Sequence, residues 1–157
     1  MAQRDPIAAY VRNARAQRRV GAGAQCSCGE ARPFALIAGA NPAICFACDR
    51  LPRGEAPFEE HHVYGRANGD LTLRVPINEH RARLSVAQYE WPPGTLSNPY
   101  GCPQCEAAAR LRGIADVMQY LSDDSRDRAQ ELEKGCDHPV KPKTAPKKTA
   151  RKPPKRG

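Results

Sequence analysis

Four cysteines in two closely spaced pairs are the feature that most restricts how this chain can fold. The pairs are Cys26-Ser-Cys28 and Cys45-Phe-Ala-Cys48, and 16 residues separate them. Two turns that each present two thiolates can surround one tetrahedral zinc ion and close the segment between them into a loop. We therefore predict a structural Zn²⁺ at these four cysteines. Buried or redox-active thiols are the alternative, since the first pair is more tightly spaced than usual.

The composition favours a metal crosslink of this kind. Of the 157 residues, 40% are hydrophobic and 6% are aromatic, so we expect one domain with a thin core. The N-terminus lacks the apolar run of a signal peptide, and no stretch is apolar over the thickness of a membrane. We therefore expect a cytoplasmic protein with no membrane partner, in which reduced thiols favour metal ligation over disulfides.

Three of the four histidines lie in one short segment after the cysteines: His61, His62 and His80. Imidazole is the commonest transition-metal ligand in proteins, and it accepts a proton near neutral pH. Such a concentration of histidines predicts a site. Because adjacent residues of a strand point to opposite faces, His61 and His62 can face one site only if the strand end twists or bulges.

The segment around these histidines predicts two strands and a helix. Residues 58–63 have the composition of a strand, and residues 71–75 alternate between apolar and polar side chains. Asn78 is a good N-cap for a helix that continues to about Gln88. The local order is therefore cysteine turns, strand, loop, strand and helix.

The run Glu60-His-His-Val-Tyr-Gly-Arg-Ala-Asn68, the strand after it and the run Asn78-Glu-His80-Arg resemble the ββα-metal core of HNH endonucleases. The resemblance covers about residues 26–88 and is greatest to phage and bacterial forms that carry an upstream four-cysteine zinc site. It implies a small, zinc-stabilised α+β fold. It also implies a metal-dependent endonuclease that hydrolyses phosphodiester bonds in DNA.

The same resemblance implies a role for each residue of the motif. His62 corresponds to the general base that deprotonates water, while His61 and His80 correspond to the ligands of one catalytic divalent ion, Mg²⁺ or Mn²⁺. Asn68 corresponds to the asparagine that orients the base or the hairpin, with Asn78 as the alternative. The rival function is a non-catalytic zinc module that binds DNA, which would have no need for the three histidines together.

Four successive regions are expected along the chain. Residues 1–24 form an N-terminal helix, which begins at Asp5-Pro6 because an N-cap is followed there by proline at the first helical position. Residues 25–90 hold the cysteine turns and the HNH-like core. Residues 91–138 form a helical extension, and residues 139–157 form a disordered basic tail.

The helical extension contains a further set of cysteines. Its helical pattern is interrupted by Gly113 and covers residues 106–112, 114–121 and 125–134. A second zinc site could form if these helices return the chain to its starting point, with the ligands Cys102, Cys105, Cys136 and His138. Unligated surface thiols, or a redox pair at the first two of these cysteines, are the alternatives.

The excess positive charge lies entirely in the tail. The net charge is +8, and eight of the 25 basic residues follow His138, which leaves 17 basic against 17 acidic residues before that point. A segment of lysine, proline and alanine has little to bury, so we expect it to be disordered. Neutralisation of phosphates makes DNA its predicted partner. The predicted DNA-binding residues are Lys141, Lys143, Lys147, Lys148, Arg151, Lys152, Lys155 and Arg156.

Overall fold

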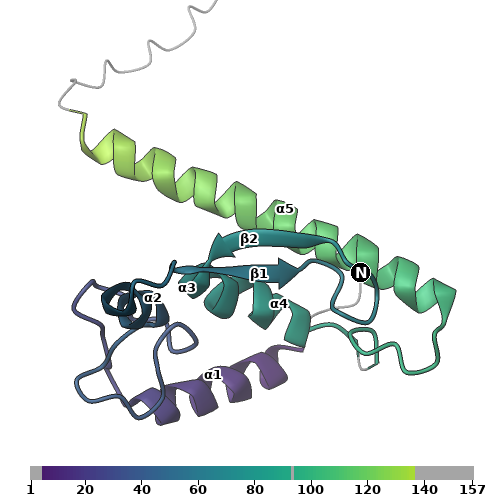
Figure 1. Cartoon of the computed structure of the whole chain (residues 1–157), viewed down its shortest axis with the longest axis horizontal. Coiled ribbons are helices and arrows are strands. Elements are labelled where there is room, and N and C mark those ends of the chain that lie inside the picture. The colour runs from purple at the N-terminus through teal and green to yellow at the C-terminus, as the bar shows by residue number, and fades with distance from the viewer. Residues whose placement is uncertain (1–4, 93, 137–157) are drawn as a thin grey trace, which may run out of the picture.

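A two-stranded antiparallel sheet lies at the centre of the molecule (Figure 1), whose computed structural model describes residues 5–92 and 94–136. Strand β1 (Phe58–His62) pairs with β2 (Thr72–Pro76), close to the predicted bounds of the two strands. The register places His61 opposite Leu73 and His62 opposite Thr72. Both histidines therefore lie at the C-terminal end of β1, where the chain enters the loop that leads to β2.

The chain leaves β2 as a helical segment in three parts: α3 (Ile77–Glu79), a π-helical turn (His80–Leu84) and α4 (Ser85–Tyr89). The predicted N-cap, Asn78, lies two residues too late, because the helix begins directly after Pro76 and Asn78 lies inside its first turn. The side chain of Asn78 is engaged elsewhere: its Oδ1 accepts the backbone N–H of Ala47 at 3.1 Å. It therefore joins the cysteine region to the helix and does not cap it.

One long helix, α5 (Pro103–Lys134), runs beside the sheet (Figure 1). The predicted interruption at Gly113 is wrong, because this glycine serves packing inside a continuous helix. A Cβ atom at Gly113 would lie 1.9 Å from the carbonyl oxygen of Val63, so no other residue lets the helix pass this close to the end of β1. Val75, Leu84 and Tyr120 bring β2, the π-helical turn and α5 together in one hydrophobic cluster.

The N-terminal part packs around the cysteines. Helix α1 (Pro6–Val20) forms as predicted, with the carboxylate of Asp5 accepting the N–H groups of Ile7 and Ala8. Helix α2 (Phe46–Arg50) follows the second cysteine pair and continues into a 3₁₀ turn (Leu51–Arg53). The second core consists of Cys26, Leu36 and Cys45, against which the C-terminal residue of α1 packs. Helix α1 and helix α5 lie on opposite sides of the sheet (Figure 1).

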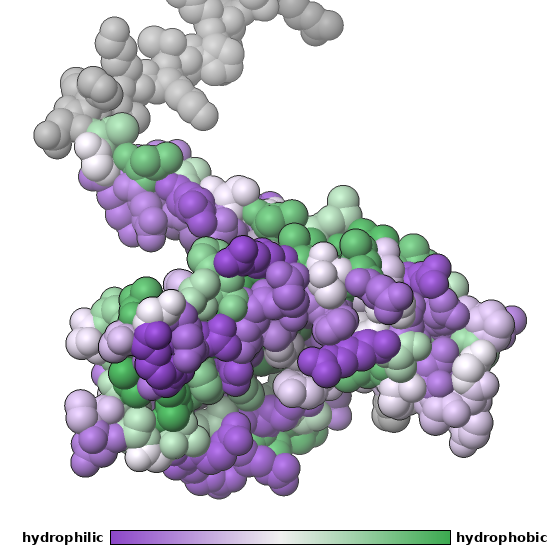
Figure 2. All heavy atoms as spheres, viewed as in Figure 1, coloured by the Kyte–Doolittle hydropathy of each residue, from purple (hydrophilic) through white to green (hydrophobic). Residues whose placement is uncertain are grey.

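Several large apolar side chains of α5 are exposed to solvent. Figure 2 shows apolar side chains along this helix, and they include Leu111, Ile114, Met118 and Leu121. None of the described helices combines the length and the hydropathy that a membrane crossing requires.

Candidate metal centre and histidine cavity

The four cysteines of the two predicted pairs converge in space. The sulfur atoms of Cys26, Cys28, Cys45 and Cys48 all lie within 4.8 Å of one another, and the Cys28 and Cys45 sulfurs are 3.7 Å apart. Tetrahedral zinc, with Zn–S bonds of about 2.3 Å, requires sulfur–sulfur distances of roughly 3.8 Å. The cluster therefore fits a metal such as Zn²⁺ with all four positions supplied by protein.

Local backbone geometry aims these sulfurs at one point. The N–H of Gly29 donates to the carbonyl of Cys26 at 2.9 Å, and Gly29 has φ 94°, a conformation that side chains with a Cβ rarely adopt. Cys45 is the N-cap of α2, where its sulfur accepts the N–H of Cys48 at 3.4 Å. A tight glycine turn and a helix N-terminus thus each present two thiols.

Charge within the cluster also suits a cation. Backbone N–H groups of Cys28 and Cys45 lower the pKa of Cys26 to about 6. The neighbouring thiols, first Cys28 and then Cys45, raise the pKa of Cys48. Four sulfurs in contact cannot all ionise without a positive charge among them, and a divalent ion supplies that charge because it binds thiolates.

Polar contacts join this cluster to the helical segment after β2. Arg32 of the cysteine loop lies between the carboxylates of Glu30 and Glu79. The amide of Asn78 bridges the N–H of Ala47 and, at 3.4 Å, the carboxylate of Glu30. The position of α3 is therefore coupled to the loop that holds the cysteines.

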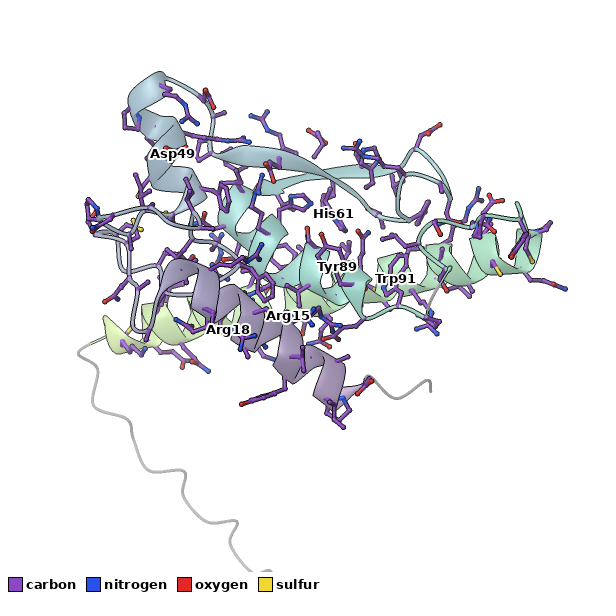
Figure 3. All side chains as sticks on the ribbon, turned by 90° about the horizontal axis from the view of Figure 1, so that it is seen from below. Arg15, Arg18, Asp49, His61, Tyr89 and Trp91 are labelled. Carbon is purple, nitrogen blue, oxygen red and sulfur yellow. The ribbon has the colours of Figure 1, made fainter. Side chains whose placement is uncertain are left out.

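The three predicted histidines line one cavity of about 550 Å³ between the hairpin, α4 and the loop after α4. The chain turns immediately after β1, where the N–H of Gly65 donates to the carbonyl of His62 at 3.0 Å. Because the strand ends in this turn, the adjacent residues His61 and His62 can both line the same cavity. The sequence had predicted that they could do so only if the strand end twists or bulges. Figure 3 shows His61 above Tyr89 of α4, on the side of the hairpin that faces the helix.

His61 is the most deeply placed of the three. It is 1% exposed, and its ring lies edge-on to that of His80 with 5.3 Å between the ring centroids. Burial, with smaller contributions from His80 and His62, lowers the pKa of His61 to about 4. The ring is neutral at pH 7, which is the form that binds a metal.

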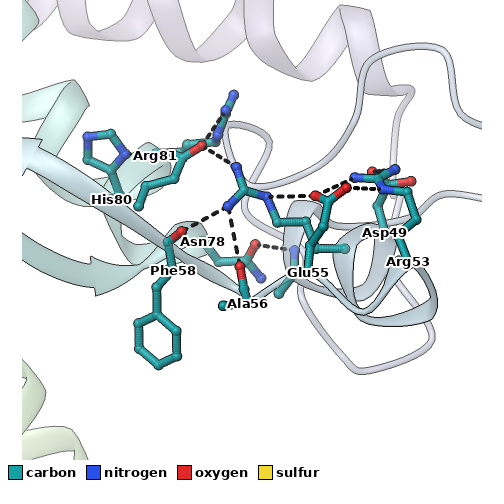
Figure 4. A network of polar contacts seen from close by, with 11 residues as sticks. Asp49, Arg53, Glu55, Ala56, Phe58, Asn78, His80 and Arg81 are labelled. Atoms are coloured by element: carbon teal, nitrogen blue, oxygen red, sulfur yellow. Dashed lines mark hydrogen bonds and ion pairs between the residues drawn. The ribbon is translucent and has the colours of Figure 1, made fainter.

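His80 is oriented by a carboxylate from β1. Its Nδ1 lies 2.7 Å from Glu59, which also accepts from Arg50 at 2.9 Å and from Arg81 at 2.8 Å (Figure 4). These partners hold the pKa of Glu59 below its usual value in spite of partial burial. With Nδ1 donating to Glu59, Nε2 of His80 is left with its lone pair, an arrangement common among metal-binding histidines.

His61 and His80 are the two residues of the cavity that could ligate a divalent ion. The imidazole rings of His61 and His80 lie edge-on to each other, and imidazole nitrogens favour transition metals over Mg²⁺. The only oxygen donor of an acidic side chain among the lining residues is Glu60. Among the described residues, only the four cysteines form a group of three or more ligand atoms close enough to surround an ion.

The side chain of His62 forms no hydrogen bond within the described part of the chain, and its Nδ1 is buried. In this respect it differs from both neighbours, since the ring of His80 contacts Glu59 and Nε2 of His61 lies 3.5 Å from the amide of Gln88. The same amide donates to the carbonyl of His62 at 2.7 Å. Gln88 thus fixes the backbone of His62 and leaves its ring free.

Asn68 does not line the cavity; it is 1% exposed and fastens the loop between the strands. Its amide nitrogen lies within 3.2 Å of the carbonyl oxygens of Tyr64, Thr95 and Leu96. Asn68 therefore ties the hairpin loop to the segment after α4. Asn68 thus holds the hairpin loop in position, whereas Asn78 contacts the cysteine region.

The described cysteines do not come together in the second zinc site that the sequence left possible. Cys102 precedes α5 and Cys136 follows it, and a straight 32-residue helix is roughly 48 Å long because each residue adds about 1.5 Å. The prediction assumed helices that return, and the continuous α5 carries the chain away instead. His138 and all eight predicted DNA-binding residues of the tail lie outside the described residues.

Two residues of this site were missed from the sequence, although both left a signal. Glu59 precedes His61 by two positions, so the alternation of β1 places them on the same face. Gln88 follows His80 by eight positions, close to two turns of helix, and therefore returns to a similar face. The sequence did not show which face of β1, or which face of the helical segment after β2, is turned towards the cavity.

Comparisons with models of known protein families, with curated proteins and with solved structures gave no match.

Proposed function

We propose that the protein is a metal-dependent DNA endonuclease of the HNH type, which hydrolyses phosphodiester bonds with His62 as general base. The observation that carries the proposal is the shared cavity. The rings of His61 and His80 lie edge-on to each other in it, and the ring of His62, which forms no hydrogen bond within the described residues, lines it beside them. The order of hairpin and helix agrees with that of the family that the sequence resembles.

Each side chain has a defined task in this reaction. His62 accepts a proton from a water molecule as the water oxygen bonds to phosphorus and the bond from phosphorus to the leaving oxygen breaks. Glu59 orients His80, and burial keeps His61 neutral. A divalent ion at His61 and His80 would polarise the scissile phosphate and stabilise the leaving oxygen.

The decisive experiment compares His62→Ala with the wild-type chain in a plasmid-cleavage assay. Loss of the base should lower the cleavage rate by about 10² to 10⁴-fold, without loss of zinc or folding. Thr72→Ala is the matched control, because Thr72 lies opposite His62 in the register but does not line the cavity. Equal cleavage by the His62 variant would exclude His62 as the base.

The choice of metal belongs in the same assay. Mn²⁺ and Ni²⁺ should be compared with Mg²⁺, because two imidazoles favour transition metals and Glu60 is the one nearby carboxylate among the described lining residues. Absence of cleavage with every ion, together with retained DNA binding, would favour a non-catalytic zinc module that binds DNA.

A further inference from the structure

A basic hollow lies on the side of α1 that faces α4. It has a volume of about 660 Å³ and is lined by four arginines and two aromatic residues: Arg12, Arg15, Arg18, Arg19, Phe34 and Tyr89. Helix α1 contains no acidic residue. Figure 3 shows Arg15 and Arg18 on α1, with Tyr89 between this helix and His61.

Three of these arginines have no carboxylate partner within the described residues. Arg15, Arg18 and Arg19 are exposed and form no ion pair there, whereas Arg12 contacts Glu90 at 3.4 Å and so holds α1 against the end of α4. Elsewhere the arginines of this chain mostly pair with carboxylates, as Arg32 does. Three unpaired guanidinium groups in one hollow form a local excess of positive charge on a body whose charges otherwise cancel.

The hollow and the histidine cavity share lining residues with a depression between them. Arg19, Phe34 and Tyr89 also line an intermediate depression of about 410 Å³, which reaches His80. Ser85, His80 and Tyr89 line both that depression and the histidine cavity. Tyr89 is 60% exposed and belongs to all three, so its ring is available to a ligand along the whole path.

The one carboxylate that borders the path before the histidine cavity is paired with cations. Glu59 borders the intermediate depression, but its carboxylate already accepts from Arg50, His80 and Arg81. Glu60 lines the histidine cavity together with Arg66. A negatively charged chain therefore meets a basic entrance and no uncompensated carboxylate before the cavity.

We propose that the arginine hollow and Tyr89 bind the sugar–phosphate backbone of a DNA strand and lead it into the histidine cavity. Guanidinium groups neutralise phosphates, and an exposed aromatic ring beside them stacks on a base. The proposal rests on the proposed function for the identity of the polyanion. It assigns to the folded body a binding surface separate from the basic tail.

Binding is measured by fluorescence anisotropy on a labelled duplex and a labelled single strand, with no added divalent ion. The full chain carries His62→Ala, so that binding is read without cleavage. Arg15→Ala/Arg18→Ala/Arg19→Ala should reduce the slope of log affinity against log salt by about 2 to 3, since each phosphate contact contributes about 0.7 to 0.9. Affinity at low salt should fall at least tenfold.

The matched control removes three positive charges from the far end of α5: Arg126→Ala/Arg128→Ala/Lys134→Ala. This variant should keep more of the salt dependence than the α1 variant, although the tail is unchanged in both. Equal effects of the two variants would overturn the proposal, because they would show a response to net charge alone. Equal binding of polyglutamate, with the same dependence on α1, would replace DNA by an acidic polypeptide.

Variants of Tyr89 test the proposal independently of the arginine variants. Tyr89→Ala should weaken binding of the single strand about tenfold, while Tyr89→Phe should preserve it because the ring is kept. Unchanged binding by Tyr89→Ala would remove this residue from the path.

If the arginine variants lose binding but the wild-type chain never cleaves, the binding surface stands and the nuclease proposal fails. If the wild-type chain cleaves and the arginine variants bind normally, only the surface is wrong.

Discussion

The cysteine cluster and the histidine cavity are both built from predicted metal ligands, yet they are organised in opposite ways. The cluster brings four sulfurs together and leaves no coordination position for another ligand. The cavity places two imidazoles edge-on to each other beside a third histidine and retains about 550 Å³ of open space. Structural zinc sites are closed by protein ligands, whereas sites that perform chemistry keep positions open. The cluster therefore has the form of a structural site, and the cavity has room for a ligand.

The two regions are also stabilised by different interactions. The core around the cysteines is small and includes two of the cysteines themselves, so a metal bound there would be its main crosslink. The end of β1 beside the cavity is instead packed against α5 at Gly113. We therefore expect the cluster to depend on metal and the cavity to depend on packing.

The largest effect is expected from Cys45→Ser. Cys45 is fully buried in the cluster, and metal-binding energy in such sites, on the order of 10 kcal/mol, is also folding energy. The variant should lose zinc, measured by atomic emission, and its cooperative thermal transition, measured by circular dichroism. Cys105→Ser, at an exposed thiol of α5, is the control. A zinc-free Cys45 variant that still unfolds cooperatively would remove the distinction between the regions.

Gly113→Ala should come next. Alanine favours helix by about 1 kcal/mol over glycine, but here its Cβ would meet the carbonyl oxygen of Val63 at 1.9 Å, so we expect a net destabilisation of about 2 kcal/mol. Denaturant unfolding measures the change, and zinc content should stay constant. Gly135→Ala is the control, because its added Cβ would have only an ordinary 3.6 Å contact. An unchanged free energy of unfolding for Gly113→Ala would show that α5 does not support β1 this closely.

Glu59→Gln tests the cavity without disturbing the cluster. Loss of the carboxylate that orients His80 should weaken binding of the divalent ion about 10- to 100-fold, measured by isothermal titration of the zinc-loaded protein with Mn²⁺ or Ni²⁺. Glu55→Gln, at an exposed carboxylate that pairs with Arg53, should leave this affinity unchanged. Equal ion affinity in wild type and Glu59→Gln would show that His80 needs no orienting partner.

The smallest effect is expected where the two regions meet. Asn78→Ala removes the hydrogen bond to Ala47, and such a bond contributes about 1 kcal/mol. Hydrogen exchange at the Ala47 amide should accelerate, while Gln130→Ala on the exposed end of α5 should not affect it. Faster exchange throughout β1 and β2 as well would mean that the cluster and the hairpin open as one unit.

Much of this arrangement could be predicted from short segments of sequence. The N-cap at Asp5, the alternation of β2 and the spacing of the cysteine pairs are local patterns, and each corresponds to a structural element found near its predicted place. The motif from Glu60 to His80 likewise identified the three histidines of the cavity. These features depend on residues close in sequence, where backbone geometry alone fixes which side chains share a face.

Tertiary structure decided the rest, because it depends on contacts between segments far apart in the chain. Gly113 was interpreted as a helix break, since the approach of Val63 cannot be seen from residues on either side of the glycine. Asn78 was interpreted as a cap, since its true partner, Ala47, lies 31 positions earlier. Only the fold showed that α5 carries Cys136 away from Cys102. It also showed that α1 places beside the histidine cavity three arginines that pair with no carboxylate in the described part of the chain. Sequence thus determined the ligands and the local elements, and long-range packing determined which of them meet.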